Sequence, residues 1–420
     1  MRLIRWLSQA PELALLAIIV LAGCALRLSA IALLNHVPQS DETAYLSMAQ
    51  NLLRGRGVLD FMGNYAMYNA GYPILVLAPL FQVFGENLLF ARLANTLLGL
   101  AAIVLVWAVA AQAGASRFGR LCAAAIWALY LPAAVYGVYL FKEHLMIPLM
   151  LGTVWCSLRL MQRPTFAVAA GCGALYGVLA VTGNASLSLL AATVAALLLA
   201  DSSKLVGKRH HIALVGVVAG TCLLVASPWM ARNAMVLGAP VLNTNGGFNL
   251  YLGNNPAATG NFISISETPR GPTWEALRKT GEVQASKVLR DDAVAWILSN
   301  PRQFAELALR KAVYFWSLPA QQGKGEPSRI ERWLRFIWLL QYLLIAGAAL
   351  SAWLFAAKRN RQVALLWLCV GVYTAVHMIF YAGSRYREPA MPLLGILAAL
   401  GVESAIDWLR TRSGSGASVA

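Results

Sequence analysis

The chain has 420 residues, of which 59% are hydrophobic and 12% are charged, and its formal net charge is +16. Average soluble domains are about 45–50% apolar and about 25% charged, so this composition excludes an ordinary soluble protein. We therefore expect an all-α polytopic membrane protein. The positive charge does not indicate nucleic-acid binding, because no soluble module combines basic with aromatic residues.

Ten apolar stretches are long enough, at roughly 20 residues, to cross a membrane as helices. The first continues past LAGC through ALRLSAIALL, so we expect a full span there and not a cleaved signal sequence. A further apolar piece, Tyr72 to Phe84, is too short to cross and contains two prolines; we expect it to be interfacial or re-entrant. The predicted spans are residues 12–34, 88–112, 120–140, 143–161, 165–183, 185–200, 212–229, 334–357, 362–382 and 389–409.

The positions of Lys and Arg predict the orientation of the chain, because these residues are enriched in cytoplasmic segments. With a cytoplasmic N-terminus, every predicted inside segment is basic, so both termini are expected inside. Residues 35–87 and 230–333 then lie on the outer face. The inside basic residues are Arg2, Arg5, Arg117, Arg120, Arg159, Arg163, Lys204, Lys208, Arg209, Lys358, Arg359, Arg361, Arg410 and Arg412.

We divide the chain into four parts. They are an N-terminal transmembrane module with the first outer loop (1–229), an outer segment (230–333), C-terminal transmembrane helices (334–410) and a disordered tail (411–420). In the outer segment, the Gly- and Asn-rich stretch NTNGGFNLYLGNNPAATG predicts tight turns with backbone close to a ligand or the membrane. Helical segments are expected near Thr273–Arg290 and Asp291–Leu309.

Two adjacent acids, Asp41 and Glu42, follow the first span in SDETAYLSMAQNLLRGRG. Ser40 is a good N-cap, and both acids suit the positive end of a helix dipole. Apolar residues recur at helical spacing from Tyr45, which predicts an amphipathic helix in the membrane interface. Successive helical residues point about 100° apart. We therefore expect one acid to face a cavity and the other to support it or bind a cation, and the helical period leaves open which is which.

Other charged residues lie on the same outer face. Glu143, in LFKEHLMIP, is either a second site acid or a helix-start charge. Arg92 lies inside a span, where an arginine normally has a partner or a role. Arginine forks match phosphate oxygens, although snorkelling to lipid headgroups is the alternative. The candidate phosphate ligands are Lys142, Arg232, Arg385 and Arg387.

The chain has no G-x-x-x-x-G-K-[ST] motif and no G-x-G-x-x-G motif in a strand–helix setting. We therefore do not expect a nucleotide-activated substrate. All six cysteines lie in apolar stretches and lack zinc-ligand spacing. The two acids could share Mg²⁺ or Mn²⁺ with a phosphate, or Arg and Lys could suffice, so a metal ligand set stays open.

Several short motifs, in the same order along most of the chain, resemble the GT-C membrane glycosyltransferases. The resemblance is to the dolichyl-phosphate-mannose–protein mannosyltransferase-like branch, which includes bacterial lipid A aminoarabinose transferases and rhizobial galacturonosyltransferases. The motifs are the Asp41-Glu42 pair with A-Y-x-x-x-A-x-N-L-L-x-G, FARLAN, the acid at Glu143, PWMARN, NGGFNLYLGNNPAATG and SRYREPAMP. The family's common Pro-Pro after the first-loop helix is here Gly71-Tyr72-Pro73.

This resemblance implies an inverting enzyme of the bacterial inner membrane with its active site facing the periplasm. It implies a polyprenyl-phosphate-linked sugar as donor, such as one on undecaprenyl phosphate, and a glycan, lipid or protein as acceptor. Asp41 is the implied general base, with Glu42 and Glu143 as further candidate catalytic acids and the four cations on the leaving phosphate. The residues predicted to line the cleft are Tyr45, Arg92, Asn249, Tyr251, Asn254, Asn255 and Tyr386.

Two other functions are consistent with the pattern. A lipid-linked oligosaccharide ligase would also use an outer loop with arginines, although acids so soon after the first span favour a monosaccharide transferase. A lipid or sugar transporter is less well supported, because transporters usually show internal repeats and a site near the bilayer midplane. Here the polar residues gather at the outer interface.

Overall fold

The computed structural model describes residues 11–198, 207–317, 328–355 and 360–415, and this part of the chain is helical with no strand. The predicted all-α fold class is therefore confirmed. Within these described residues, seven segments are long and apolar enough to cross a membrane, as expected for a polytopic membrane protein. They are α2 (Glu12–Leu33), α5 (Leu88–Gln112), α8 (Glu143–Gln162), α11 (Lys208–Leu237), α16 (Arg329–Phe355), α17 (Arg361–Ile379) and η5 with α18 (Ser384–Ala390 and Met391–Ser415), the last as far as Arg410.

The count of ten spans stays a prediction, because three predicted spans are shorter or broken helices. The predicted span 120–140 is two helices, α6 (Arg117–Leu129) and α7 (Leu131–Tyr136), which meet at Tyr130 just before Pro132. A proline cannot donate to the preceding turn, so a new helix begins there. The spans predicted at 165–183 and 185–200 are α9 (Phe166–Thr182), η2 (Asn184–Leu187) and α10 (Ser188–Leu198).

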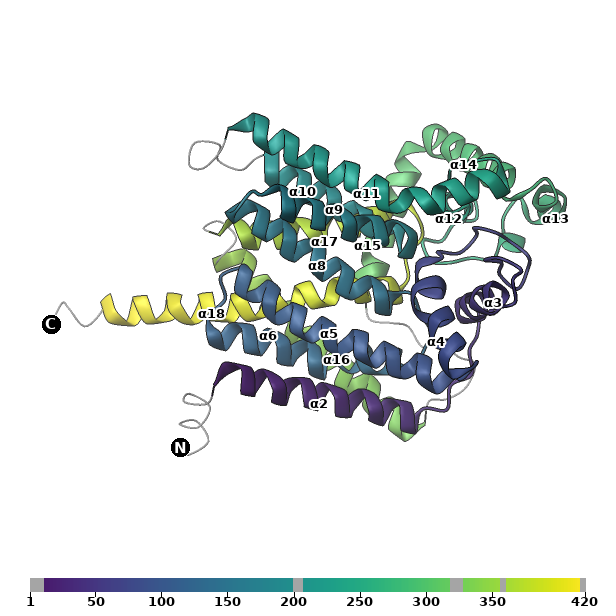
Figure 1. The fold of residues 1–420 in the computed structure, drawn as a ribbon. Coiled ribbons are helices and arrows are strands. Elements are labelled where there is room, and N and C mark those ends of the chain that lie inside the picture. Colours follow the sequence, from purple (N-terminus) through teal and green to yellow (C-terminus); the bar gives the residue numbers. More distant parts are fainter. Residues whose placement is uncertain (1–10, 199–206, 318–327, 356–359, 416–420) are drawn as a thin grey trace.

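Small residues set how closely the helices pack. A Cβ placed on Gly173 of α9 would lie 2.4 Å from the carbonyl oxygen of Val218 in α11, and one on Gly177 would lie 2.8 Å from that of Cys222. Because glycine has no side chain, α9 and α11 can pack closely side by side. The start of α2 and the end of α18 lie at one end of the molecule, and α3 (Asp41–Leu53) and α12 to α14 lie at the opposite end (Figure 1). This arrangement agrees with both termini on one side.

The first outer loop contains the predicted amphipathic helix as α3. It also contains a helix over the short apolar piece, as a π-turn η1 (Pro73–Leu77) followed by α4 (Ala78–Phe84). The predicted boundary at 229/230 falls inside α11, which continues to Leu237 despite Pro228.

The outer segment is more helical than the Gly and Asn pattern predicts. Half of the stretch predicted to form tight turns is the helix α12 (Asn245–Gly253), whose glycines serve close packing, and residues 254–260 after it form turns and loop. A Cβ on Gly247 would collide with the carbonyl oxygen of Ser286, and one on Gly253 would lie 2.5 Å from that of Phe380. The predicted helix boundaries are also wrong, because Gly281 at φ 100° and Pro301 separate the helices. These are η3 (Ile265–Glu267), η4 (Gly271–Thr273), α13 (Trp274–Arg278), α14 (Glu282–Ser299) and α15 (Pro301–Trp316).

The last helix, α18, continues through residues 411–415, the first half of the predicted tail. Residues 416–420 lie outside the described part of the chain, as do Arg2, Arg5, Lys204, Lys358 and Arg359.

Candidate active site

A cavity of about 560 Å³ lies among the outer helices and loops. Pockets of 300–1,000 Å³ are typical of small-molecule sites. Its lining comes from α3, the following loop, the start of α8, α12, α13, α14 and the segment before α18. Of the residues predicted from the sequence, six line this cavity: Asp41, Tyr45, Lys142, Asn249, Arg385 and Tyr386.

Arg385 contacts two of the three predicted catalytic acids, Asp41 and Glu143. Its Nη2 donates to Oδ2 of Asp41 at 2.6 Å, and its Nε lies 3.7 Å from Oε1 of Glu143. The guanidinium also stacks over the ring of Phe141, 4.2 Å from the ring centroid. These contacts hold a cation at the surface of the cavity, while the side chain of Glu143 is only 9% exposed.

Lys142 brings a second cation to the cavity from the residue before α8. Within the described residues its ammonium has neither a hydrogen bond nor an ion pair. Burial lowers the pKa of Lys142, and the nearby charges of Glu143 and Asp41 act in the opposite direction. An unpaired ammonium beside a guanidinium can bind an anion such as phosphate.

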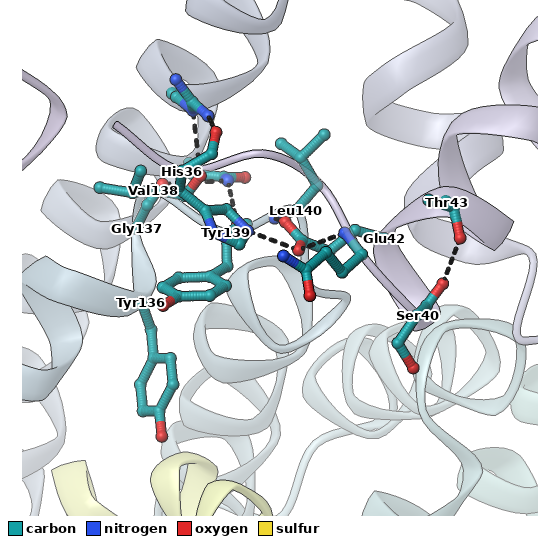
Figure 2. Close-up of polar contacts among 12 residues, drawn as sticks. His36, Ser40, Glu42, Thr43, Tyr136, Gly137, Val138, Tyr139 and Leu140 are labelled. Carbon is teal, nitrogen blue, oxygen red and sulfur yellow. Dashed lines mark hydrogen bonds and ion pairs between the residues drawn. The ribbon is translucent and has the colours of Figure 1, made fainter. Parts of the chain in front are cut away.

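Glu42 points away from the cavity and ties the first outer loop to the loop before α8. Its Oε2 lies 2.6 Å from Nε2 of His36 and accepts from the backbone N–H of Gln39, and its Oε1 accepts from the backbone N–H of Leu140 at 2.7 Å. Figure 2 shows this carboxylate between His36 and Leu140. Because Glu42 is 1% exposed and fully bonded, it anchors the start of α3, and only Asp41 of the pair faces the cavity.

The expected Ser40 cap does not form. The Ser40 side chain makes no capping hydrogen bond, and its backbone has φ 52° and ψ −119°. Among the described residues it is the one non-glycine with positive φ. Such a conformation costs of order 1–3 kcal/mol and occurs mainly at functional sites. Thr43 Oγ1 instead donates to the Ser40 carbonyl at 2.6 Å. This bond from the first turn of α3 stabilises the turn before Asp41.

The outer end of the cavity combines aromatic and polar side chains. Trp274 and Phe248 lie with ring centroids 5.3 Å apart, next to Asn245 and Asn249 of α12. Glu282 closes this end by accepting from Thr244 Oγ1 at 2.8 Å and from backbone N–H groups in the first outer loop. Aromatic faces and amide groups together suit the apolar and hydroxyl faces of a sugar.

Several predicted residues lie elsewhere and support the walls instead. Arg232 donates to the carbonyls of Tyr65 at 3.0 Å and Val58 at 3.1 Å, so it fastens the first outer loop to α11. Arg92 donates to the carbonyls of Val138 and His36. Arg387 is fully buried and donates to the carbonyls of Phe315 and Ser317. Outside the cavity lining are also Tyr251, Asn254 and Asn255, all buried.

Sequence reasoning did not single out several other residues that line the cavity. These are Asn64, Tyr68, Asn69, Asn245, Phe248, Trp274, Glu275, Arg278, Glu282 and Tyr381. The one available signal was the aromatic and amide composition of NGGFNLYLGNN, which does not tell which side chains share a surface. Burial and the nearby Asp41 charge raise the pKa of Tyr68 to about 12, so its phenol stays a hydrogen-bond donor at neutral pH.

A divalent cation fits poorly between Asp41 and Glu143. Within the described residues no group of three or more His, Cys, Asp or Glu side chains is arranged to hold a metal. Mg²⁺ requires near-octahedral oxygen coordination. Here the guanidinium of Arg385 lies between Asp41 and Glu143, and a like-charged metal ion there would meet it.

The fold is that of solved membrane glycosyltransferases. Over 99% of this chain and 53% of the other, it is similar to the archaeal oligosaccharyltransferase AglB from Archaeoglobus fulgidus, solved with an inhibitory peptide and a dolichol-phosphate, at 13% identity and TM-score 0.55. A structure of the oligosaccharyltransferase of the same organism with Zn and sulfate matches at 14% identity, 95% and 50% coverage and TM-score 0.53. ArnT from Cupriavidus metallidurans in the apo state matches at 18% identity, 95% and 62% coverage and TM-score 0.52.

These similarities confirm the predicted GT-C architecture. The chain spans about half the length of the oligosaccharyltransferases it matches. No protein-family model and no curated protein matches the sequence. At such low identity the likeness establishes the fold, and the activity has to be argued from the site.

Proposed function

We propose that this protein is an inverting membrane glycosyltransferase that moves one sugar from a polyprenyl phosphate to an acceptor on the outer face of a bacterial inner membrane. The observation that carries the proposal is one cavity with a carboxylate, Asp41, and two cations, Lys142 and Arg385, at the same end. Group transfer from a lipid phosphate requires both a base and a cationic site for the leaving group. The GT-C architecture supports this reading.

In the proposed reaction, the acceptor hydroxyl oxygen attacks the anomeric carbon of the donor. The bond between that carbon and the phosphate oxygen breaks, and the leaving polyprenyl phosphate keeps the electron pair. Asp41 takes the hydroxyl proton as the new bond forms. A positioned base of this kind contributes roughly 10²–10⁴-fold to the rate.

Arg385 and Lys142 are proposed to bind the phosphate of the donor and the negative charge that grows on it. Fixed cations aimed at developing charge lower the barrier without reorganisation during the reaction. Because Arg385 already bonds Asp41, the phosphate competes with Asp41 for this guanidinium. Donor binding would then free the carboxylate to act as a base.

The outer end of the cavity is proposed to bind the acceptor. Trp274 and Phe248 offer aromatic surface, and Asn245 and Asn249 offer amide donors and acceptors. This composition favours a glycan or a sugar-bearing lipid as acceptor over an unmodified protein.

A lipid-linked oligosaccharide ligase is the second candidate, favoured by the similarity to AglB and by a cavity large enough for more than one sugar. A transporter is less well supported, because the polar cavity lies among the outer elements and not at mid-membrane.

The test is transfer of radiolabelled sugar from undecaprenyl-phosphate sugars in membranes, comparing native protein with Asp41→Asn at equal expression. We expect a loss of about 10²-fold or more in transfer, with donor binding retained. Glu86→Gln, an exposed acid in the first outer loop, is the matched control and should transfer at the native rate. If Asp41→Asn also transfers at the native rate, Asp41 is not the base. If native protein uses lipid-linked oligosaccharides and no monosaccharide donor, the ligase is correct.

A further inference from the structure

A second, smaller chamber lies behind the active-site cavity, between α2, α5, α6, α8 and the segment before α18. The charged and polar side chains that reach it include Arg27, Trp127, Glu143 and Glu388. Arg385 lines both the chamber and the cavity, and within the described part of the chain it is the one residue that the two linings share. The chamber therefore contacts the proposed phosphate site through a single guanidinium.

The residues that line the chamber carry polar atoms that have no hydrogen-bond partner among the described residues. Both carboxylate oxygens of Glu388, Oε2 of Glu143, Nη2 of Arg27 and Nε1 of Trp127 are buried and unpartnered. Glu388 is 4% exposed and Arg27 is 2% exposed. Buried polar groups in native proteins are almost always paired, with protein or with ordered water. Three acceptor oxygens and two donor nitrogens facing one space indicate a bound polar ligand.

The size of the chamber identifies that ligand as water. It offers about 30 Å³ to the centres of water molecules, and one water needs roughly 10–15 Å³ by this measure and two to four polar partners. About two waters therefore fit, whereas a phosphate, a sugar or a lipid headgroup does not.

The surroundings of Arg27 show that the chamber is a built feature of the packed helices. Nη1 of Arg27 donates to the carbonyls of Gly23 at 3.0 Å and Ala128 at 3.1 Å, which leaves Nη2 for the chamber. A Cβ on Gly99 would lie 2.7 Å from Nε of Arg27. Glycine at this position makes room for a buried arginine, whose cost in a membrane span is large unless it has a partner.

We propose that the chamber holds about two ordered water molecules that join Glu388 to Glu143, and that Glu388 thereby positions Arg385 for the donor phosphate. Glu388 and Arg385 lie three residues apart in η5 (Ser384–Ala390), and Oε1 of Glu143 lies 3.7 Å from Nε of Arg385. Water-mediated bonds are enthalpically close to direct ones, so this network can fix Glu143 and the guanidinium together. The positioning step rests on the proposed function, but the bound water does not.

The first experiment is a structure of the native protein in lipid nanodiscs, at a resolution that shows water. We expect density for ordered water within about 2.7–3.2 Å of Glu388 and Glu143 oxygens. A dry chamber, or a direct contact that pairs Glu388 with Arg27 or Glu143, would overturn the proposal.

The second experiment measures binding of undecaprenyl phosphate, which requires no knowledge of the sugar. Glu388→Gln keeps groups that bond water, whereas Glu388→Leu removes them at similar size. In metal sites, loss of the hydrogen bonds that support a ligating residue weakens binding about 10–100-fold, and we expect an effect of the same order here. We expect Glu388→Leu to raise the dissociation constant about tenfold or more, and Glu388→Gln to restore binding to within about threefold of native.

The matched control is Glu403→Leu, which removes a carboxylate in the middle of α18 that is bonded to Ser116 and Gly119. A general loss of stability would weaken binding in both leucine variants, and positioning would weaken it in Glu388→Leu alone. Equal binding in Glu388→Leu and native protein, or equal losses in both leucine variants, would overturn the positioning role. If native protein does not bind undecaprenyl phosphate, the proposed function fails. The density for water then remains the test of whether the chamber holds ordered water.

Discussion

Arg385 Nη2 donates a hydrogen bond of 2.6 Å to Oδ2 of Asp41, across 344 positions of sequence. Both side chains are about one-quarter exposed, to the same cavity. The proposed base is therefore paired with the residue proposed to bind the donor phosphate. A charge-assisted bond of this kind is short and roughly twice as strong as a neutral one.

The first prediction concerns this pairing. In Asp41→Asn the carboxylate no longer competes for Arg385, so we expect undecaprenyl phosphate to bind a few-fold more tightly even though transfer is lost. Arg385→Gln should weaken binding by about tenfold or more, since a charged hydrogen bond is worth about 1.5–3 kcal/mol. Both are measured with purified protein in detergent, by titration with undecaprenyl phosphate. Weaker binding in Asp41→Asn would show that Asp41 holds Arg385 in its binding geometry and does not compete with the donor.

The second prediction concerns Glu42 as a structural anchor. Glu42→Ala leaves His36 and the N–H groups of Gln39 and Leu140 without their buried acceptor, which should lower the free energy of unfolding by about 3–5 kcal/mol. The measurement is the thermal unfolding midpoint in detergent. Glu86→Ala is the control, because its pair with Arg54 is exposed and such pairs contribute about 0–1 kcal/mol. Similar midpoints for both variants would contradict the anchoring role.

The third prediction uses the strained backbone of Ser40. Glycine adopts φ 52° without a Cβ penalty, so Ser40→Gly should raise the free energy of unfolding by about 1 kcal/mol. Ser40→Ala keeps the Cβ and should give no gain, which separates the backbone effect from loss of the hydroxyl. Thermal unfolding of the two variants against native protein is the measurement, and a gain in Ser40→Ala equal to that in Ser40→Gly would rule out relief of strain.

The fourth prediction is a pH dependence of stability caused by Lys311. This lysine in α15 is fully buried, and its Nζ donates to Oδ1 of Asn254 at 2.9 Å and to the carbonyl of Ile379 at 3.3 Å. Burial lowers the pKa of Lys311 from 10.5 to about 7. Between these two values the unfolded chain binds more protons than the folded protein, so stability rises with pH across this window.

Unfolding midpoints at pH 6 and pH 9 test this sign. Native protein should gain stability towards pH 9, by up to about 1.4 kcal/mol for each pH unit above the folded pKa. Lys311→Met should reduce this gain. The difference in stability in favour of Lys311→Met over native protein should be largest at pH 6. The exposed Lys279→Met serves as a control and should keep the native pH dependence. A native pH dependence in Lys311→Met would assign the effect to another group.

Much of the fold was predictable because it depends on local sequence. Long apolar stretches can satisfy their backbone hydrogen bonds in a membrane only as helices or closed barrels. Their length and the distribution of Lys and Arg predicted a helical membrane protein with two outer segments. The amphipathic pattern after Ser40 predicted α3. Helix boundaries were less predictable near Tyr130 and in α12, where proline and close packing of glycines decide the local structure.

The sequence suggested residue types for a candidate site, but not how they are arranged in space. From the sequence, Asp41, Lys142 and Arg385 are expected on one face, and so are Arg232 and Arg387. In the structure, however, Arg232 and Arg387 donate hydrogen bonds to backbone carbonyls. The adjacent acids Asp41 and Glu42 have similar chemistry, and the rotation of α3 decides that one faces the cavity and the other is buried. Aromatic and amide residues at the outer end become neighbours only when α12, α13 and the first outer loop pack together. Sequence by itself therefore determined the class of fold, because hydrophobic length and charge bias act locally, whereas side-chain partnership across 344 positions depends on how the helices pack.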